Sequence, residues 1–247
     1  MVHEIFSSIQ GEGIWIGERH IFVRFAGCDI SCRFCDTPSA TPINPDNQRL
    51  QFCRIQSISD LHLHEQVPNP VSASDLTALC KRFIIPGPSH PTLSLTGGEP
   101  LLHCSFLAQW LPTVRTTFKM YLETNGIHAD AMLDLRDMID VVSMDFKLPS
   151  ATGLRPFWDE HAQFLSAARG KPLFVKSVVT NDTLKTDIVT AARILAGFDR
   201  SITFVLQPAG GKYVPSAAML IEFQRVALES LEDVRVIPQA HKIMDLP

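Results

Sequence analysis

The stretch IFVRFAGCDISCRFCDT, residues 21–37, joins a short run of β-forming residues to a cluster of three cysteines. Apart from Arg24, its first five residues are β-branched or aromatic, which is typical of a buried strand. Three of the chain's six cysteines follow within eight residues, as Cys28, Cys32 and Cys35. Thiols so close together do not form a conventional disulfide framework and indicate a metal site. The segment therefore predicts a strand whose carboxyl end carries metal-binding chemistry.

Strand-like and helix-like segments alternate along the rest of the chain. Strands are predicted at 92–96, 119–123, 141–145, 173–179, 202–207 and 234–238. Helical periodicity predicts helices at 72–83, where Ser72 or Ser74 is the N-cap, and at 105–114, 157–169, 183–198 and 216–231. Such alternation predicts an α/β fold with a mostly parallel sheet and right-handed crossovers. We expect an open, partial β/α barrel of about six strands within a single domain spanning 1–247.

One region departs from this pattern. Residues 38–71 contain five prolines, many amides and little periodicity. They predict either an irregular excursion or a small appendage inserted after the cysteine loop.

Composition narrows the class of protein. The formal charge of −4 and the pI near 6.1 give no basic surface for nucleic-acid phosphates, so direct DNA or RNA binding is not expected. No stretch approaches about 18 consecutive apolar residues, and the N-terminus lacks a basic start followed by an apolar run. We expect a cytoplasmic protein with no membrane association.

Polar motifs follow the predicted strands at their carboxyl ends. They are GGEP (97–100), ETNG (123–126), DFK (145–147), QPAGG (207–211) and QAHK (239–242). Because the carboxyl ends of parallel strands meet at one mouth of such a fold, these motifs and the cysteine loop are expected to surround a single site. Glycines at 97 and 98 let backbone groups approach a ligand there.

The Cys-x3-Cys-x2-Cys spacing suits an iron–sulfur cubane. Each thiolate can bind one iron, which leaves the fourth iron without a protein ligand. A zinc site is the alternative, and it needs a fourth ligand such as His20 or His103.

The three-cysteine motif with Phe34 before its last thiol, followed by GGEP on a later strand end, resembles the radical S-adenosylmethionine (SAM) superfamily. The resemblance implies a [4Fe-4S] cluster on Cys28, Cys32 and Cys35, with SAM chelating the open iron and yielding a 5′-deoxyadenosyl radical. The residues that it places against SAM are Phe34, Asp36, Gly98, Ser143, Met144, Asp145, Gln207, Pro208, Ala209 and Gly210. Ser143 and Asp145 suit hydroxyls, and Gln207 suits ribose or adenine.

Within that superfamily, EIFSSIQGEGIWIGERHIFVRFAGC (4–28) and CRFCDT (32–37) resemble the 7-carboxy-7-deazaguanine synthases. This family converts 6-carboxy-5,6,7,8-tetrahydropterin to a 7-deazapurine with loss of ammonia. The resemblance recurs at TGGEP, ETNG and QAHK and thins out over 38–91, a divergent insertion. It implies hydrogen abstraction from C6, ring contraction and regeneration of SAM. The substrate residues that it implies are Ile9, Gln10, Gly11, Glu12, Arg24, Thr96 and Pro247.

Arg24 carries a planar fork of donors on an apolar strand and suits a substrate carboxylate. For Thr37 the resemblance implies contact with Mg2+, which binds few protein oxygens and keeps water; a helix N-cap is the alternative role. The expected partners are the pterin, an electron donor such as flavodoxin or ferredoxin, and a second copy of the chain. Two rival functions remain open: an activase that installs a glycyl radical on a partner protein, and a module whose metal is structural.

Overall fold

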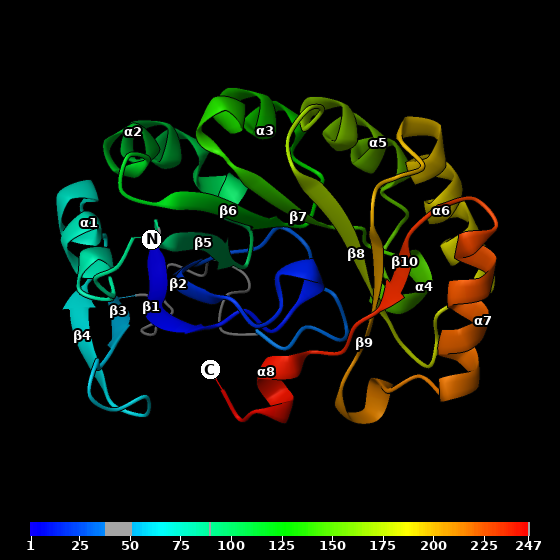
Figure 1. The fold of residues 1–247 in the computed structure, drawn as a ribbon, viewed down its shortest axis with the longest axis horizontal. Coiled ribbons are helices and arrows are strands. Elements are labelled where there is room, and N and C mark those ends of the chain that lie inside the picture. The colour runs from blue at the N-terminus through cyan, green and yellow to red at the C-terminus, as the bar shows by residue number, and fades with distance from the viewer. Residues whose placement is uncertain (38–50, 89, 247) are drawn as a thin grey trace.

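The computed structural model describes residues 1–37, 51–88 and 90–246. Within this part of the chain, ten strands form one sheet in the order β10-β9-β8-β7-β6-β5-β2-β1-β3-β4. The strands at the two ends, β10 and β4, do not pair with each other, so the sheet curves without closing (Figure 1). The expected open α/β architecture is confirmed.

The parallel part of the sheet contains seven strands, which is the number of β-forming runs found in the sequence. They are β2 (Arg19–Phe25), β5 (Thr92–Gly97), β6 (Lys119–Thr124), β7 (Val141–Asp145), β8 (Leu173–Val179), β9 (Phe204–Pro208) and β10 (Val234–Val236). All seven overlap the segments predicted from β-forming runs. That the chain is a single domain over 1–247 stays a prediction.

Three further strands extend the sheet beyond β2. The N-terminal strand β1 (Val2–Ile9) is antiparallel to β2 and parallel to β3 (Phe52–Gln56). β3 then pairs with β4 (His64–Pro68) as an antiparallel hairpin. Part of the segment predicted as an irregular excursion or a small appendage is ordered sheet, in which Cys53 and Ile55 alternate inward and are fully buried. Residues 38–50 lie outside the described residues.

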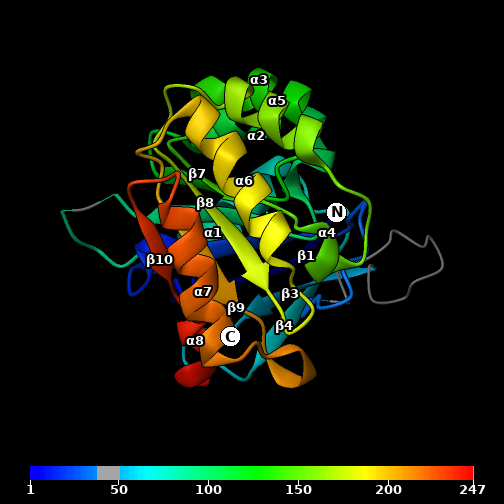
Figure 2. The same ribbon diagram turned by 90° about the vertical axis from the view of Figure 1, so that its right-hand side faces the viewer.

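Helices cover the convex face of the sheet (Figure 1). They are α1 (Ala73–Lys81), α2 (Cys104–Val114), α3 (Ala129–Leu135), α5 (Trp158–Ala167), α6 (Lys185–Phe198) and α7 (Ala217–Leu228). Ser72 caps α1 by accepting a hydrogen bond from the Asp75 backbone N–H at 3.1 Å. Of the two alternative N-caps predicted, Ser72 and Ser74, the structure therefore has Ser72. Figure 2 shows α6 and α7 side by side on this face. The short helices α4 (Pro149–Thr152) and α8 (Ala240–Ile243) were not predicted.

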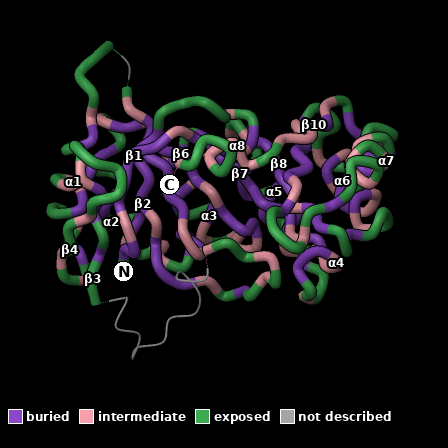
Figure 3. The backbone as a smooth tube through the Cα atoms, turned by 90° about the horizontal axis from the view of Figure 1, so that it is seen from below, coloured by how far each residue is buried: buried purple, intermediate pink, exposed green. Residues whose placement is uncertain are grey.

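Strand alternation separates two environments. Side chains such as Leu95, Leu122 and Val142 point toward the helices and are fully buried in the main core. The opposite, concave face has a second small cluster of Tyr121, Val141, Phe174 and Val205 at its base. In Figure 3 the strands are mostly purple, whereas the outer helices carry green, exposed stretches. Polar residues near the strands' carboxyl ends therefore face a cavity on the concave side.

No helix in the described part of the chain is long and apolar enough to cross a membrane.

Candidate active site

The cysteine loop follows β2 and is held from both sides. On one side the His103 ring lies 2.8 Å from the Ala26 carbonyl, and Asp29 Oδ2 lies 3.1 Å from His128 Nε2. On the other side Arg33 donates from its backbone N–H to the Thr152 carbonyl, at 3.1 Å. These contacts hold the loop that presents the three thiols against the mouth of the sheet.

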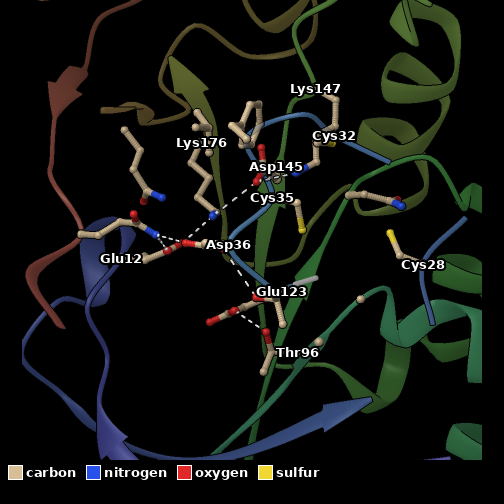
Figure 4. Close-up of a pocket in the computed structure, with 18 of the residues that line it drawn as sticks. Glu12, Cys28, Cys32, Cys35, Asp36, Thr96, Glu123, Asp145, Lys147 and Lys176 are labelled. Atoms are coloured by element: carbon tan, nitrogen blue, oxygen red, sulfur yellow. Dashed lines mark hydrogen bonds and ion pairs between the residues drawn. The ribbon is translucent and has the colours of Figure 1, made fainter. Parts of the chain in front are cut away.

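The three thiols of the loop are free and line one pocket (Figure 4). Burial raises the pKa of Cys28 to about 11, and burial also raises the pKa of Cys32. Without a metal, these raised pKa values favour the protonated thiols. A bound metal would favour the thiolates, since metal ligation deprotonates a thiol. Among the described residues, no three His, Cys, Asp or Glu side chains are grouped closely enough to share one metal ion. Separated thiols fit a cubane, in which each binds a different iron, better than a single zinc.

The pocket has about 1030 Å³ of empty space, counting the part open to solvent. The cysteine loop and all five predicted polar motifs contribute residues to its lining, together with Glu12 from the loop after β1. The size suits a bound small molecule.

Two lysines and two carboxylates form a chain of charges across this pocket (Figure 4). Asp145 Oδ2 lies 2.8 Å from Lys147 Nζ and 3.3 Å from Lys176 Nζ, and Lys176 also contacts Glu12 Oε2 at 2.5 Å. Burial alone would raise the pKa values of both carboxyls, but the neighbouring ammonium charges outweigh it and lower them. Both acids are therefore held ionised by buried cations.

A second cavity of about 670 Å³ of empty space adjoins the first. The lining residues that the two share are Glu12, Arg24, Asp36, Thr37, Thr96, Glu123 and Lys242. Glu123 accepts hydrogen bonds from Gln10 Nε2 at 2.8 Å and from the Thr96 hydroxyl at 2.7 Å. Arg24 Nε donates to Glu4 Oε1 at 2.7 Å, which fixes the guanidinium at the cavity wall. Charged groups of both signs therefore line this cavity.

The GGEP turn is fixed by Glu99, which is fully buried. Its carboxylate accepts from the Asn125 backbone N–H at 2.7 Å and from the Thr124 hydroxyl at 2.9 Å, and so links this turn to the ETNG turn. Gly97 has a φ of +135°, and a Cβ there would lie 2.2 Å from the Phe25 carbonyl oxygen. Only glycine allows this close approach of β5 to β2.

The C-terminal segment returns to the pocket through α8. Gln239 Nε2 donates to Glu12 Oε1 at 2.7 Å and to Asp36 Oδ2 at 3.1 Å. The Ala240 backbone N–H donates to the Gly11 carbonyl at 2.8 Å. The predicted substrate contact Pro247 lies outside the described residues.

Most residues proposed from the sequence come together here. Those lining the larger pocket are Glu12, Arg24, Cys28, Cys32, Phe34, Cys35, Asp36, Thr37, Thr96, Gly98, Asp145, Gln207, Ala209 and Gly210. Ile9, Gln10 and Gly11 line the adjoining cavity. Ser143, Met144 and Pro208 line neither. The Met144 side chain is buried in the core beneath the helices, and Ser143 hydrogen-bonds the Tyr121 side chain.

Several pocket residues have no role that the sequence predicted. Glu123 and Asn125 belong to the ETNG turn, and Gln239 and Lys242 belong to the QAHK stretch. For Lys176 the sequence does carry a signal: it is a lone charge inside the apolar run LFVKSVV, on the same strand face as Phe174. A lysine at such a position needs a buried partner.

The larger pocket fits the cofactors that the sequence implied. Asp145 Oδ1 and Gln207 Oε1 are buried without a hydrogen-bond partner within the described structure, and both residues line the pocket. Unsatisfied acceptors of this kind suit ligand hydroxyl or amine donors. Together with the three thiols, they give the pocket the groups that a cluster and SAM require.

Comparisons with known proteins agree with this site. A family model described as a 4Fe-4S single cluster domain matches residues 9–149. The 7-carboxy-7-deazaguanine synthase of Geobacter sulfurreducens is 40% identical over 247 residues, covering 98% of this chain and 96% of the relative. The enzyme of that name from Methanopyrus kandleri is 32% identical, with 99% and 93% covered.

Solved structures show the same fold. QueE from Escherichia coli matches with a TM-score of 0.61 at 22% identity, over 96% of this chain and 92% of that one. A structure of TYW1 with a lysine-pyruvate adduct bound matches with a TM-score of 0.51 at 14% identity, over 85% and 73%.

The open sheet and the three-thiol pocket define a radical SAM protein, a class of iron–sulfur enzymes. Similarity over the full length to the two named relatives identifies the family within this class. The chain belongs to the 7-carboxy-7-deazaguanine synthase family. This membership argues against the glycyl-radical activase and the structural metal module as alternatives.

Proposed function

We propose that this chain converts 6-carboxy-5,6,7,8-tetrahydropterin to 7-carboxy-7-deazaguanine with release of ammonia. The observation that carries the proposal is that two cavities adjoin: the larger is lined by the three thiols and the smaller by Gln10, with Arg24 and Glu123 lining both. The relatives' name indicates a carboxylated deazaguanine product. A carboxylated, nitrogen-rich bicyclic substrate suits the second cavity.

The thiols of Cys28, Cys32 and Cys35 would hold the [4Fe-4S] cluster, and Asp145, Gln207 and the backbone at Gly98 would hold SAM. When bound, these groups supply the radical chemistry that removes a hydrogen atom from the substrate. The chain's own contribution is placement. Asp145 is kept ionised by Lys147 and Lys176, so its unpartnered oxygen is ready to accept a hydroxyl hydrogen bond.

In the substrate cavity Arg24 would bind the carboxylate. Glu4 engages only its Nε, and the guanidinium's other N–H donors suit a planar carboxylate. Glu123 and Gln10 would meet the amide and amine edge of the pterin, because a carboxylate accepts from ring N–H groups and a side-chain amide both donates and accepts. These contacts would fix the carbon that loses its hydrogen relative to SAM.

Mg2+ is part of the proposal through Thr37. Thr37 lines both cavities, and its hydroxyl lies 3.5 Å from Asp36 Oδ1. An ion that takes few protein oxygens and retains water suits this position between protein and substrate. The alternative N-cap role would involve residues outside the described part. A flavodoxin or ferredoxin as reductant, a homodimer and a cytoplasmic location also stay predictions.

The proposal is tested by incubating the anaerobically reconstituted protein with SAM, a reductant, Mg2+ and carboxytetrahydropterin. We expect the deazapurine and ammonia in equal amounts, with SAM not consumed. Stoichiometric loss of SAM with the pterin unchanged would contradict the proposal.

Arg24→Gln should raise KM for the pterin at least tenfold, since a charge-assisted bidentate contact is lost, which is worth ~1.5–3 kcal/mol. The Kd of SAM should change little in this variant.

A further inference from the structure

Lys176 is the only lysine in the described part of the chain that forms ion pairs with two acids: Asp145, which lines the larger pocket alone, and Glu12, which lines both cavities. Its Nζ lies 2.5 Å from Glu12 Oε2 and 3.3 Å from Asp145 Oδ2. The three residues come from separate parts of the chain: the loop after β1, strand β7 and strand β8. Figure 4 shows the lysine reaching toward both carboxylates across the pocket.

Because Lys176 is buried, its ammonium depends on these two ion pairs for stabilisation. The Lys176 residue is 8% exposed, and its pKa is raised well above the ordinary value because the charges of Glu12 and Asp145 outweigh the effect of burial. A buried ammonium without such partners is strongly unfavourable. The lysine and the two carboxylates therefore hold one another in place.

Each carboxylate has one oxygen held by Lys176 and another directed elsewhere. Asp145 Oδ1 is buried and unpartnered among the described residues, on the side of the pocket that fits SAM. Glu12 Oε1 accepts from Gln239, and the Glu12 backbone N–H donates to Gln10 Oε1 at 3.0 Å. Gln10, which lines the smaller cavity, in turn donates to Glu123, which lines both cavities. The arrangement of each half thus depends on the same ammonium.

We propose that Lys176 is a positioning residue that couples the binding of the two ligands, so that occupancy of the SAM half favours occupancy of the pterin half. This inference rests on the proposed function for the identity of the ligands. A ligand that orders Asp145 also orders Lys176 and Glu12. The second ligand then binds to side chains that are already ordered, so its binding loses less conformational entropy. The coupling is reciprocal, because it is a difference of binding free energies.

Lys147 offers a matched comparison. It also contacts Asp145, at 2.8 Å, and also lines the larger pocket. Within the described structure its ammonium forms no ion pair with Glu12, Asp36 or Glu123, the acids that line the smaller cavity. Replacing Lys147 removes the same charge from the same carboxylate. Its loss should therefore weaken SAM binding without uncoupling the two halves.

The test measures equilibrium binding of SAM and of 6-carboxypterin, the oxidised analogue, to the reconstituted holoenzyme under anaerobic conditions. In the wild type we expect saturating carboxypterin to tighten SAM binding about fivefold or more. In Lys176→Met both ligands should bind about tenfold more weakly, and the ratio of SAM affinities with and without carboxypterin should fall to about one. In Lys147→Met SAM alone should weaken, with the coupling ratio retained. Lys176→Arg, which keeps the charge, should restore part of the coupling.

Retention of the coupling in Lys176→Met, its loss in Lys147→Met, or absence of coupling in the wild type would overturn the inference. Should Lys176→Met not fold, Glu12→Gln breaks the same link while leaving the Lys176–Asp145 pair, and it should also remove the coupling. If the wild type binds SAM but not carboxypterin, the proposed function fails and this inference with it. If both ligands bind without the predicted pattern, only the inference fails.

Discussion

The Nζ atom of Lys242 lies 2.7 Å from Asp36 Oδ2, so the C-terminal helix α8 is bonded to the residue that follows the third cysteine. The hydrogen bond and charge of Lys242 help to lower the pKa of Asp36 to about 2, against the opposing effect of burial, which is the largest single influence. This pair, with Gln239, holds the C-terminal segment over the pocket.

Lys242→Met should loosen this segment without unfolding the protein. Both side chains are about half exposed, so the pair contributes less than about 1 kcal/mol to global stability. We expect faster amide hydrogen exchange in residues 240–246 and an unfolding midpoint within a few degrees of the wild type. Lys81→Met, on an exposed position of α1, is the control and should change neither. Unchanged exchange in the Lys242 variant would show that the hydrogen bonds of Gln239 and Ala240 hold the segment without this pair.

Gly97 and Gly197 should respond in opposite directions to substitution by alanine. At Gly97 the φ of +135° and the 2.2 Å approach to the Phe25 carbonyl forbid a Cβ, and we expect a loss of at least about 2 kcal/mol. Gly197 lies inside α6, where a Cβ would have no described atom of another element within 4 Å, so alanine should stabilise the protein by about 0.5–1 kcal/mol. Chemical denaturation of both variants measures the difference. Equal effects would mean that the strand crossing at Gly97 tolerates a side chain.

The sequence predicted the seven parallel strands because each is a compact apolar run, and it predicted the site because polar motifs follow those runs. It did not predict β1, where Glu4, Ser7 and Ser8 interrupt the apolar pattern. The side-chain partners of two of them lie on the neighbouring strand and not nearby in the sequence: Glu4 bonds Arg24, and the Ser7 hydroxyl donates to the His20 carbonyl at 3.2 Å. Local periodicity carries no information about such pairings.

The same reason explains why the charges in the site were not predicted. Lys176 binds a carboxylate 164 positions away in the sequence, and Gln239 binds the same carboxylate from 227 positions away. The sequence shows that a lysine interrupts an apolar strand, but only the folded sheet shows which acids it meets. Motifs with a fixed local spacing, such as the three cysteines, are the part of the site that sequence can place.

Stability should fall as the pH drops below neutrality, because two buried histidines resist protonation. Burial, with a smaller effect from Lys119, lowers the pKa of His20 to about 4, and burial lowers that of His161 to about 4 as well. The unfolded chain, with ordinary pKa values near 6.5, binds more protons between these limits, so stability rises with pH across that window. Each histidine should cost about 1 kcal/mol between pH 6.5 and about 5.5, since the unfolded imidazole is only half protonated at the upper limit.

Urea unfolding at several pH values measures this slope. His20→Asn removes one titrating group and should reduce the loss of stability between pH 6.5 and 5.5 by about 1 kcal/mol, whatever its effect on stability at neutral pH. His62→Asn, at an exposed position, should keep the full slope. A slope unchanged in His20→Asn would mean that other groups cause the acid sensitivity.

The three loop cysteines should each be needed for metal, and the remaining cysteines should not. Cys28, Cys32 and Cys35 line the pocket, whereas Cys104 lies at the start of α2 with its thiol 3.9 Å from Asp134 Oδ2. A cubane held by three thiolates loses a corner with any one of them. After anaerobic reconstitution we expect about four irons per wild-type chain, with matching sulfide and visible charge-transfer absorption. Alanine at any of the three loop positions should lower the iron content severalfold, while Cys104→Ala should retain the wild-type content. One zinc per chain in place of iron, or a loop variant with full iron, would contradict the assignment of these thiols.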